Sequence, residues 1–390
     1  MRVLMTGGYG CIGSWVAKQV VEAGGEVWIF DLKEDRHRLE MLLDGAMLGR
    51  VHFVQGDVAD PVGVRSATEA VEASHLLHLA GLQVPTCRAD PLLGARVNVL
   101  GTLAVFEAAV TLKDQVKRVV YASSAAVHGP VAEGSTGPIG DEVRLAPLTH
   151  YGAFKVCNEL NARVYWLDRG ISSVGLRPWT VYGVGRDFGI TSEPTKAIKA
   201  AAVGRPYAIS YGGLQDLQYV GDVASTFLRA LAEPFEGAEA FNVRGAVVPM
   251  GEFVATLREA SGLDLVTHGD RQLPIAPDLD DSRLQERLGP IPATPLAEGV
   301  ADTFGPVRRP PRRRPARPVG PGGMKEARGP LRAKGAPGRL WVPGWSGRIT
   351  SGSRRRGRSG WPAGPARASR RGPPPGSGWG PWGRGRRASA

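Results

Sequence analysis

The stretch Thr6-Gly7-Gly8-Tyr9-Gly10-Cys11-Ile12-Gly13 decides the fold of this chain. It follows a short apolar run at 2–5 and opens a run at 11–23 whose apolar residues recur at helical spacing. Three of its glycines stand three residues apart, which permits a tight turn and lets the backbone approach a pyrophosphate. The helix that follows directs free N–H groups at the same point. A glycine triplet alone is a weak signal, but the strand before it and the helix after it predict a dinucleotide-binding loop.

The next 165 or so residues repeat this alternation of short β-rich runs with helical stretches. We predict further strands at 26–30, 51–54, 76–79, 116–121 and 172–176, and long helices at 92–112 and 151–168. Strands separated by helices imply parallel pairing and a sheet covered on both faces. The predicted fold class is α/β, a doubly wound parallel sheet of the Rossmann type.

We predict three regions along the chain. Residues 1–178 form the NAD-binding Rossmann domain, to which a strand at 218–220 and a helix at 222–232 return, within 216–233. Many prolines interrupt residues 179–305, which we expect mainly to form a small substrate-binding cap, from 179–215 and 235–300. Residues 306–390 hold 18 Gly and 15 Pro, so they cannot bury enough apolar surface to offset their ordering entropy. We therefore expect 306–390 to be a disordered tail.

The charge of the chain comes from that tail. Residues 306–390 contain 22 Lys and Arg and one acidic residue, whereas residues 1–305 contain 27 basic and 36 acidic residues. The formal net charge of +12 therefore does not make the first 305 residues a nucleic-acid-binding domain. The tail's arginines and tryptophans fit RNA or an anionic surface. Its composition fits equally well an out-of-frame translation of GC-rich DNA, which we favour, so nucleic acid is a partner only if the tail is genuine.

Three widely spaced cysteines, Cys11, Cys87 and Cys157, form no CxxC pair. This number favours a reduced, cytoplasmic protein and offers neither a disulfide framework nor a metal site. No uninterrupted apolar run approaches the roughly 20 residues of a membrane span. We expect no signal peptide, because the first apolar residues lead directly into the glycine loop.

The ends of the next predicted strands supply further cofactor residues. Asp31 ends the second strand, 18 residues after Gly13, where a carboxylate accepts hydrogen bonds from the adenosine ribose and repels a 2′-phosphate. NAD is therefore favoured over NADP. Asp57 and Val58, after the third strand, are placed to meet the adenine. Residues 79–81 (Leu79, Ala80 and Gly81), after the fourth, are placed beneath the pyrophosphate and ribose.

Tyr151 and Lys155 stand four residues apart in a predicted helix and so share one face. A free phenol has a pKa of about 10, and a nearby ammonium group stabilises its phenolate form. Such a tyrosine can take a proton from a substrate hydroxyl while hydride leaves the same carbon for a nicotinamide ring. Ser123 and Ser124 follow the fifth strand, where a serine can hydrogen-bond the reacting oxygen.

With these motifs in order, residues 1–305 resemble the extended short-chain dehydrogenase/reductases of the NAD-dependent epimerase/dehydratase family. The resemblance rests on TGGYGCIG (6–13), GDV (56–58), HLAG (78–81), VNVLGT (97–102), YASSAAVHG (121–129), YGAFK (151–155), LRP (176–178) and YVGDVA (219–224).

The resemblance implies roles for single residues. Ser124, Tyr151 and Lys155 would be catalytic, and Lys155 would also hold the nicotinamide ribose. Asn98 would steady the active-site helix beside the cofactor, and Pro178 would pack near the nicotinamide. The cofactor set is completed by the loop residues Gly7, Gly10, Cys11, Ile12 and Gly13. The substrate side would comprise Gln83, Ser123, Ser124, Thr180 and Arg186. The family commonly forms homodimers through the helices that correspond to 92–112 and 151–168.

The motifs are most similar to those of sugar-nucleotide 4-epimerases, with departures. The nucleotide-sugar members usually carry an arginine in the segment 213–219 that grips the diphosphate, and here Gln215 stands in its place. Thr180 replaces the usual asparagine and His128 the usual tyrosine. Ala125 and Ala126 stand where a dehydratase needs an acidic pair.

Three functions follow from this pattern. The first, preferred because of Gln215, is an NAD-dependent oxidoreductase or epimerase acting on a secondary hydroxyl of a sugar, sugar acid or related polyol. The second is a UDP-sugar 4-epimerase that holds its NAD tightly. The third is a non-catalytic NAD-sensing protein, which retention of Tyr151 and Lys155 disfavours. Arg186 either meets the substrate or is a solvated loop charge. His128 and His150 flank the site as proton relays or as polar loop histidines, and the latter is favoured.

Overall fold

The computed structural model describes residues 1–130 and 137–308, and the backbone alone for 306–308. Most of the predicted tail, 309–390, therefore lies outside the described residues, and its disorder stays a prediction.

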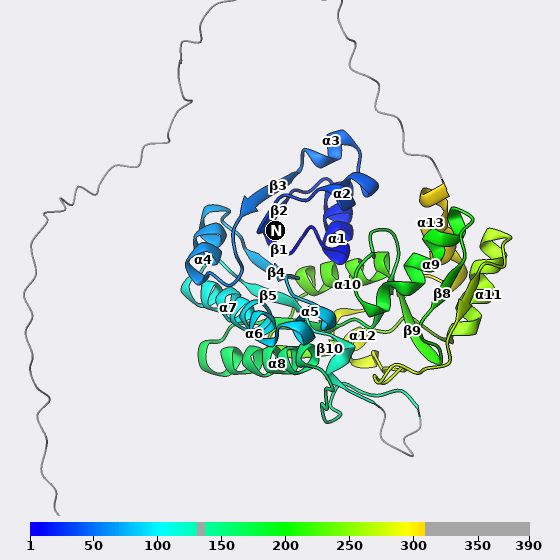
Figure 1. The fold of residues 1–390 in the computed structure, drawn as a ribbon. Coiled ribbons are helices and arrows are strands. Elements are labelled where there is room, and N and C mark those ends of the chain that lie inside the picture. Colours follow the sequence, from blue (N-terminus) through cyan, green and yellow to red (C-terminus); the bar gives the residue numbers. More distant parts are fainter. Residues whose placement is uncertain (131–136, 309–390) are drawn as a thin grey trace, which may run out of the picture. The chain divides into compact units, whose positions relative to one another are not determined.

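A seven-stranded parallel sheet forms the centre of the described chain (Figure 1). Its strand order is β10-β6-β5-β4-β1-β2-β3. The strands are β1 (Val3–Thr6), β2 (Val27–Asp31), β3 (Val51–Gln55), β4 (His75–His78), β5 (Arg118–Ala122), β6 (Ser173–Arg177) and β10 (Ala238–Asn242). The order reverses between β1 and β4, so a crevice for a ligand opens at the carboxyl ends of these two strands. The predicted doubly wound Rossmann class is confirmed.

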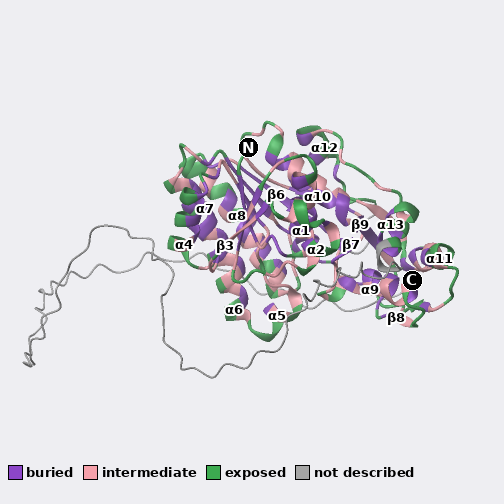
Figure 2. Ribbon diagram, turned by 90° about the horizontal axis from the view of Figure 1, so that it is seen from above, coloured by how far each residue is buried: buried purple, intermediate pink, exposed green. Residues whose placement is uncertain are grey.

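Helices cover both faces of this sheet because its strands are apolar on both faces. Val3 and Met5 of β1 pack into one cluster with α1 and α10, while Leu4 packs into the opposite cluster with α4 and α7. One layer contains α1 (Cys11–Glu22), α10 (Val220–Ala232) and α2 (His37–Leu42), with α3 (Gly45–Leu48) and α12 (Ser282–Leu288) at its borders. The other contains α4 (Pro61–Ala70), α5 (Val84–Ala89), α7 (Gly101–Thr111) and α8 (His150–Arg169). Figure 2 shows the buried residues concentrated between the helix layers.

The helix expected at 92–112 is not one regular helix. It consists of α6 (Pro91–Ala95), the π-helical turn η1 (Arg96–Leu100) and α7. Asn98 lies in the π turn, and its main-chain carbonyl accepts hydrogen bonds from Thr102 Oγ1 (2.7 Å) and Asn158 Nδ2 (2.9 Å). Wider turns of this kind occur often at functional sites.

The same segment bears on the expectation that no uninterrupted apolar run approaches the length of a membrane span. By length and composition alone, Pro91–Thr111 is long and apolar enough to do so. Half of its most apolar window is buried inside the fold, and α7 supplies Val105 and Phe106 to the cluster shared with α4. A helix of a protein core passes the same test, so this is weak evidence for a membrane span.

The chain after β6 divides differently from our expectation. Residues 218 and 219 of the strand predicted at 218–220 belong to β9 (Leu214–Tyr219), and Val220 already begins α10. β9 joins not the main sheet but a three-stranded sheet with β7 (Thr180–Tyr182) and β11 (Ala246–Pro249). Pro178 lacks an N–H and ends the pairing of β6, so β7 leaves the main sheet. Conversely, β10, expected in the cap, pairs with β6 as the last strand of the main sheet. The predicted helix at 222–232 corresponds to α10, which packs on α1 at the main sheet.

The remaining elements form the cap around a core of their own, which includes Trp179, Tyr211 and Phe253. They are α9 (Glu193–Ala202), β8 (Tyr207–Ile209), α11 (Met250–Ser261), β12 (Val266–His268) and α13 (Leu296–Arg308), with the short 3₁₀ turns η2 (Ala125–Val127) and η3 (Ile190–Ser192) nearby. Figure 1 shows α9, α11 and α13 together, apart from α4, α7 and α8.

One buried carboxyl in this region makes stability depend on pH. Asp216 of β9 is fully buried and accepts hydrogen bonds from Gln218 Nε2 (2.8 Å) and the Gly245 N–H (2.7 Å). Burial raises its pKa to about 7, although these hydrogen bonds oppose the shift. The folded state therefore holds this proton more tightly than the unfolded state, and its contribution to stability is lost as the pH rises through 7.

We predict that replacing Asp216 with Asn removes this loss. As the pH rises from 5 to 8, the unfolding free energy of the parent should fall by about 2 kcal/mol more than that of the variant. Urea unfolding at both pH values measures the difference, and the exposed Asp264→Asn serves as the control. An equal pH dependence in Asp216→Asn and the parent would contradict the prediction.

Candidate active site

A groove of about 370 Å³ runs along the carboxyl ends of the first strands, at the crevice that the sheet topology predicts. The predicted cofactor residues that line it are Gly7, Gly10, Cys11, Ile12, Gly13, Asp31, Asp57, Val58, Leu79, Ala80 and Gly81. It therefore unites the glycine loop with the ends of β2, β3 and β4.

The glycine loop leaves room for a phosphate only because it lacks side chains. Gly7 has φ +67°, and a Cβ there would lie 2.6 Å from the Ala80 backbone. A Cβ on Gly13 would lie 2.6 Å from the Gly8 backbone, so α1 can approach the loop this closely only with glycine. The α1 N-terminus thus opens directly onto the groove, as a pyrophosphate requires. These residues fit the pyrophosphate of a dinucleotide.

Asp31 lies at the end of β2 in the same groove. Its Oδ1 accepts the Leu32 N–H at 2.8 Å, and burial raises the pKa of the carboxyl, partly offset by such hydrogen bonds. Its position fits an acceptor for the two ribose hydroxyls. Asp57 instead accepts from the Ala59 N–H (2.9 Å) and pairs with Arg96 (3.2 Å).

A second cavity of about 330 Å³ adjoins the groove, because Cys11, Leu79, Gly81, Gln83 and Arg186 are among the residues that line both. Its other lining residues include Ser123, Ser124, Tyr151, Lys155 and Pro178. The structure thus brings together the predicted catalytic trio beside the groove.

The start of α8 sets the position of Tyr151. Thr149 caps this helix by accepting the Gly152 N–H at 3.0 Å. A Cβ at Gly152 would lie 2.5 Å from the Ala126 carbonyl oxygen, so only glycine lets α8 approach the turn after β5 so closely. Ser124 begins that turn, where its Oγ accepts the Ala126 N–H at 3.2 Å.

Lys155 is buried, and its Nζ donates to the Ala122 carbonyl at 2.6 Å. The Nζ lies 5.6 Å from the centroid of the Tyr151 ring. Burial lowers the pKa of Lys155 to about 8, against the opposing effects of the Cys87 and Glu159 charges. Burial raises the pKa of Tyr151, while the Ser124 hydroxyl beside it lowers it. In the protein alone both groups are therefore shifted towards their neutral forms.

A buried ion pair holds α8 against the end of the sheet. Glu159, one turn beyond Lys155, receives Arg177 Nε and Nη2, each at 2.9 Å, and also accepts the Ser123 hydroxyl. Arg177 Nη1 reaches the Asp141 carbonyl at 3.1 Å. This contact extends the network to the segment before α8.

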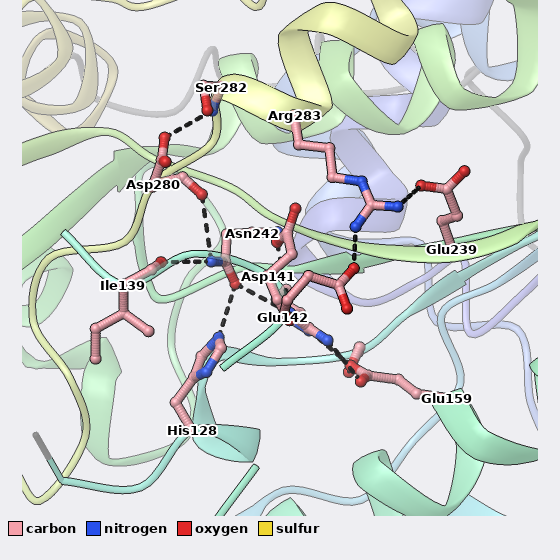
Figure 3. A network of polar contacts seen from close by, with 12 residues as sticks. His128, Ile139, Asp141, Glu142, Glu159, Glu239, Asn242, Asp280, Ser282 and Arg283 are labelled. Atoms are coloured by element: carbon pink, nitrogen blue, oxygen red, sulfur yellow. Dashed lines mark hydrogen bonds and ion pairs between the residues drawn. The ribbon is translucent and has the colours of Figure 1, made fainter. Parts of the chain in front are cut away.

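The same network reaches β10 through Asn242. In Figure 3, His128, Ile139 and Asp280 converge on Asn242. Its Oδ1 meets His128 Nε2 at 2.7 Å, and its Nδ2 donates to the Ile139 carbonyl at 2.8 Å. His128 is therefore a buried structural group, and burial lowers its pKa. His150 is exposed at the start of α8, so neither histidine lines the cavities.

Three further predicted residues make contacts that the sequence does not reveal. Thr180 is buried in β7 and lines neither cavity. Ser123 lines the cavity but gives its hydroxyl to Glu159. Asn98 is buried behind the groove, where it accepts the Leu82 N–H at 2.8 Å and donates to the Leu82 carbonyl at 3.0 Å. Asn98 thus shapes the groove from behind, and its carbonyl holds Asn158 of α8.

Among the residues that line the second cavity, Arg88, Trp179 and Arg271 were not expected from the sequence. Trp179 is buried, and its Nε1 donates to the Ala276 carbonyl at 2.6 Å. Arg271 comes from a stretch without helical or strand periodicity. A bridge between Gly212 and Gln272 holds that stretch in place, and no pattern in the sequence indicates it. Among the described residues, no cluster of three or more His, Cys, Asp or Glu is placed to hold a metal.

Comparison with known proteins agrees with this geometry. Residues 3–243 match the NAD dependent epimerase/dehydratase family. The chain belongs to this family. It is 30% identical to a UDP-glucose 4-epimerase of Azospirillum brasilense, over 77% of this chain and 89% of the relative. It is also 30% identical to one of Mycolicibacterium smegmatis, over 78% of this chain and 97% of the relative.

Among solved structures, the NAD complex of Thermus thermophilus UDP-glucose 4-epimerase aligns with a TM-score of 0.67. The two are 28% identical, over 79% of this chain and 99% of that one. The family member described here is an NAD-dependent enzyme of the epimerase/dehydrogenase type. When bound, NAD supplies the hydride acceptor. The residues that would hold it are those of the glycine loop and of the ends of β2, β3 and β4 that line the groove.

We predict that Glu159→Gln destabilises the fold by about 3–5 kcal/mol, because the buried Arg177 loses the carboxylate at 2.9 Å and keeps only that of Asp141 at 3.5 Å. Urea unfolding measures the loss. The matched control is Glu22→Gln, which breaks the partly exposed pair with Lys18 and should cost less than about 1 kcal/mol. A loss in Glu159→Gln no larger than that of the control would show that the pair does not hold α8 in place.

Proposed function

We propose that this chain is an NAD-dependent epimerase that oxidises and re-reduces a secondary hydroxyl of a sugar joined to a nucleoside diphosphate. The observation that carries the proposal is one cavity that joins Ser124, Tyr151 and Lys155 to the dinucleotide groove and to three arginines. The curated relatives named above, UDP-glucose 4-epimerases, support it.

The three arginines change the conclusion drawn from Gln215, which had disfavoured a nucleotide sugar. Its side chain is buried and donates to the Gly212 carbonyl at 3.0 Å, so it lines neither cavity. Arg88, Arg186 and Arg271 reach the cavity from three separate segments. Guanidinium groups are well suited to bind a diphosphate, and here Arg88 and Arg271 join Arg186, which was expected from the sequence. This supports the nucleotide sugar over the free sugar or sugar acid that the sequence favoured.

The roles of the catalytic residues follow from their positions. Tyr151 takes the proton of the sugar hydroxyl, and Ser124 hydrogen-bonds the same oxygen. Lys155, held by the Ala122 carbonyl, favours the phenolate through its positive charge. For epimerisation the proton returns from Tyr151 to the same oxygen after the sugar ring presents its other face. Gln83 and Arg186 line both cavities and are placed to position the sugar.

We further propose a homodimer formed through the helices at 92–112 and 151–168. Exposed apolar side chains on the first are Leu92 (84%), Leu93 (42%) and Leu100 (54%), and on the second Leu160 (57%), Val164 (50%) and Leu167 (67%). The two helical segments contact each other within the chain. Large exposed apolar patches mark interaction surfaces, and the exposure of these side chains on two helical segments in contact supports such a surface here. The three free cysteines support a cytoplasmic location.

Tyr151→Phe tests the catalytic assignment. We expect kcat for interconversion of UDP-galactose and UDP-glucose to fall by roughly 10²–10⁴-fold, because a general acid–base is lost. Tyr165→Phe is the matched control, since this phenol lies on the same helix but bonds Glu107 outside the cavity. Net NADH formation with free sugars, without turnover of nucleotide sugars, would show a dehydrogenase instead. Unchanged turnover in Tyr151→Phe would refute the mechanism.

The double variant Leu160→Asp, Leu167→Asp tests the dimer. We expect it to be monomeric where the parent is dimeric, because each carboxylate would be buried in the interface. Light scattering after size exclusion measures the mass. Val203→Asp, equally exposed but in the cap, should remain dimeric. A monomeric parent would contradict the proposal.

A further inference from the structure

The segment 183–189 carries Arg186 between the two cavities. Its sequence is Gly-Val-Gly-Arg-Asp-Phe-Gly, and all three of its glycines have positive φ, from +89° to +135°. Residues other than glycine rarely adopt these backbone angles. Because glycine is also flexible, contacts with neighbouring elements must hold the segment in this conformation. We call it the Arg186 loop.

Arg186 itself is poised for an anion that the protein does not supply. It lines both the dinucleotide groove and the substrate cavity. Its Nη2 donates to Thr191 Oγ1 at 2.9 Å, whereas its buried Nε has no partner among the described residues. The position of this guanidinium therefore matters to both ligands.

Arg38 of α2 holds the Arg186 loop on both sides of Arg186. Its Nε donates to the Gly185 carbonyl at 2.9 Å and its Nη2 to Asp187 Oδ1 at 2.7 Å. Burial alone would raise the pKa of Asp187, but the hydrogen bond and charge of Arg38 hold it below its usual value. The carboxylate is therefore ionised and paired at neutral pH.

The same guanidinium also contacts the cofactor loop. Its Nη1 donates to the Tyr9 carbonyl at 2.9 Å, in the middle of the glycine-rich turn. Only 18% of the Arg38 side chain is exposed. Trp15 of α1 adds a parallel contact, since its Nε1 donates to the Val184 carbonyl at 2.9 Å. The guanidinium group of Arg38 thus joins the glycine-rich turn to the Arg186 loop by three hydrogen bonds. Its planar shape fixes the directions of all three.

We propose that Arg38 is a positioning residue that couples the NAD groove to Arg186 in the substrate cavity. Binding of NAD fixes the glycine loop and, through the Tyr9 carbonyl and Arg38, the Arg186 loop. Arg186 is then in place when the substrate arrives. Lysine cannot replace Arg38, because one ammonium group cannot hold three acceptors in the fixed directions of a guanidinium.

Hydrogen exchange with NAD alone tests this coupling without any substrate. In the parent protein NAD should slow amide exchange at 7–16 and also, about ten-fold, at 183–189. In Arg38→Lys the slowing at 7–16 should persist while that at 183–189 falls at least to about a third of its parent value. Arg50→Lys is the control, since Arg50 also donates to a carbonyl (Gly24, 2.6 Å) but not at the site.

Equal slowing at 183–189 in Arg38→Lys and the parent, or none in the parent, would overturn the proposal. If Arg38→Lys does not fold, Asp187→Asn removes the ion pair from the other end. This variant should also weaken the NAD-induced slowing of exchange at 183–189, though by less than Arg38→Lys. A second readout rests on the proposed function: Arg38→Lys should raise KM for the nucleotide sugar about ten-fold with kcat little changed. The exchange result stands even if that substrate is wrong.

Discussion

The buried pair of Glu159 and Arg177 is the interaction on which the catalytic geometry depends. Both carboxylate oxygens are occupied by the guanidinium, and Ser123 donates a third hydrogen bond. This one carboxylate therefore fixes α8 against the ends of β5 and β6, and with them Tyr151, Lys155 and Ser124. A buried charge pair contributes little net stability, but losing one partner is costly.

The cofactor groove depends on a different constraint, the absence of side chains. Gly7 and Gly13 let backbone segments meet at distances that a Cβ would forbid, and the α1 N-terminus consequently faces the groove. The groove and the adjoining cavity share Arg186 and Gln83, so these two residues border both spaces. The proposed substrate site and the groove for NAD are then parts of one connected site.

The sequence analysis predicted those parts of the fold and site that local chemistry determines. Alternating apolar runs indicate the parallel sheet, and the spacing of Tyr151 and Lys155 indicates one helix face. It could not predict the strand pairing after Pro178, because nothing local distinguishes β10, at the edge of the main sheet, from β9 in the smaller one. For the same reason the sequence does not indicate that Arg271 lines the cavity. From the sequence, Gln215 counts as evidence against a nucleotide sugar, but it is buried away from the cavity and does not bear on the substrate. The role of Asn98 in a π turn likewise depends on contacts distant in sequence.

The proposed epimerisation requires that hydride leave a sugar carbon and return to it within this one site. The direct measurement uses UDP-galactose that carries deuterium at C4 of the sugar, with the full chain, NAD and an excess of unlabelled NADH in solution. We predict that the UDP-glucose formed keeps its deuterium at C4, because the nicotinamide remains bound beside Tyr151 between the two transfers. Replacement of the deuterium at C4 by hydrogen from the free NADH, or no interconversion at all, would contradict this mechanism.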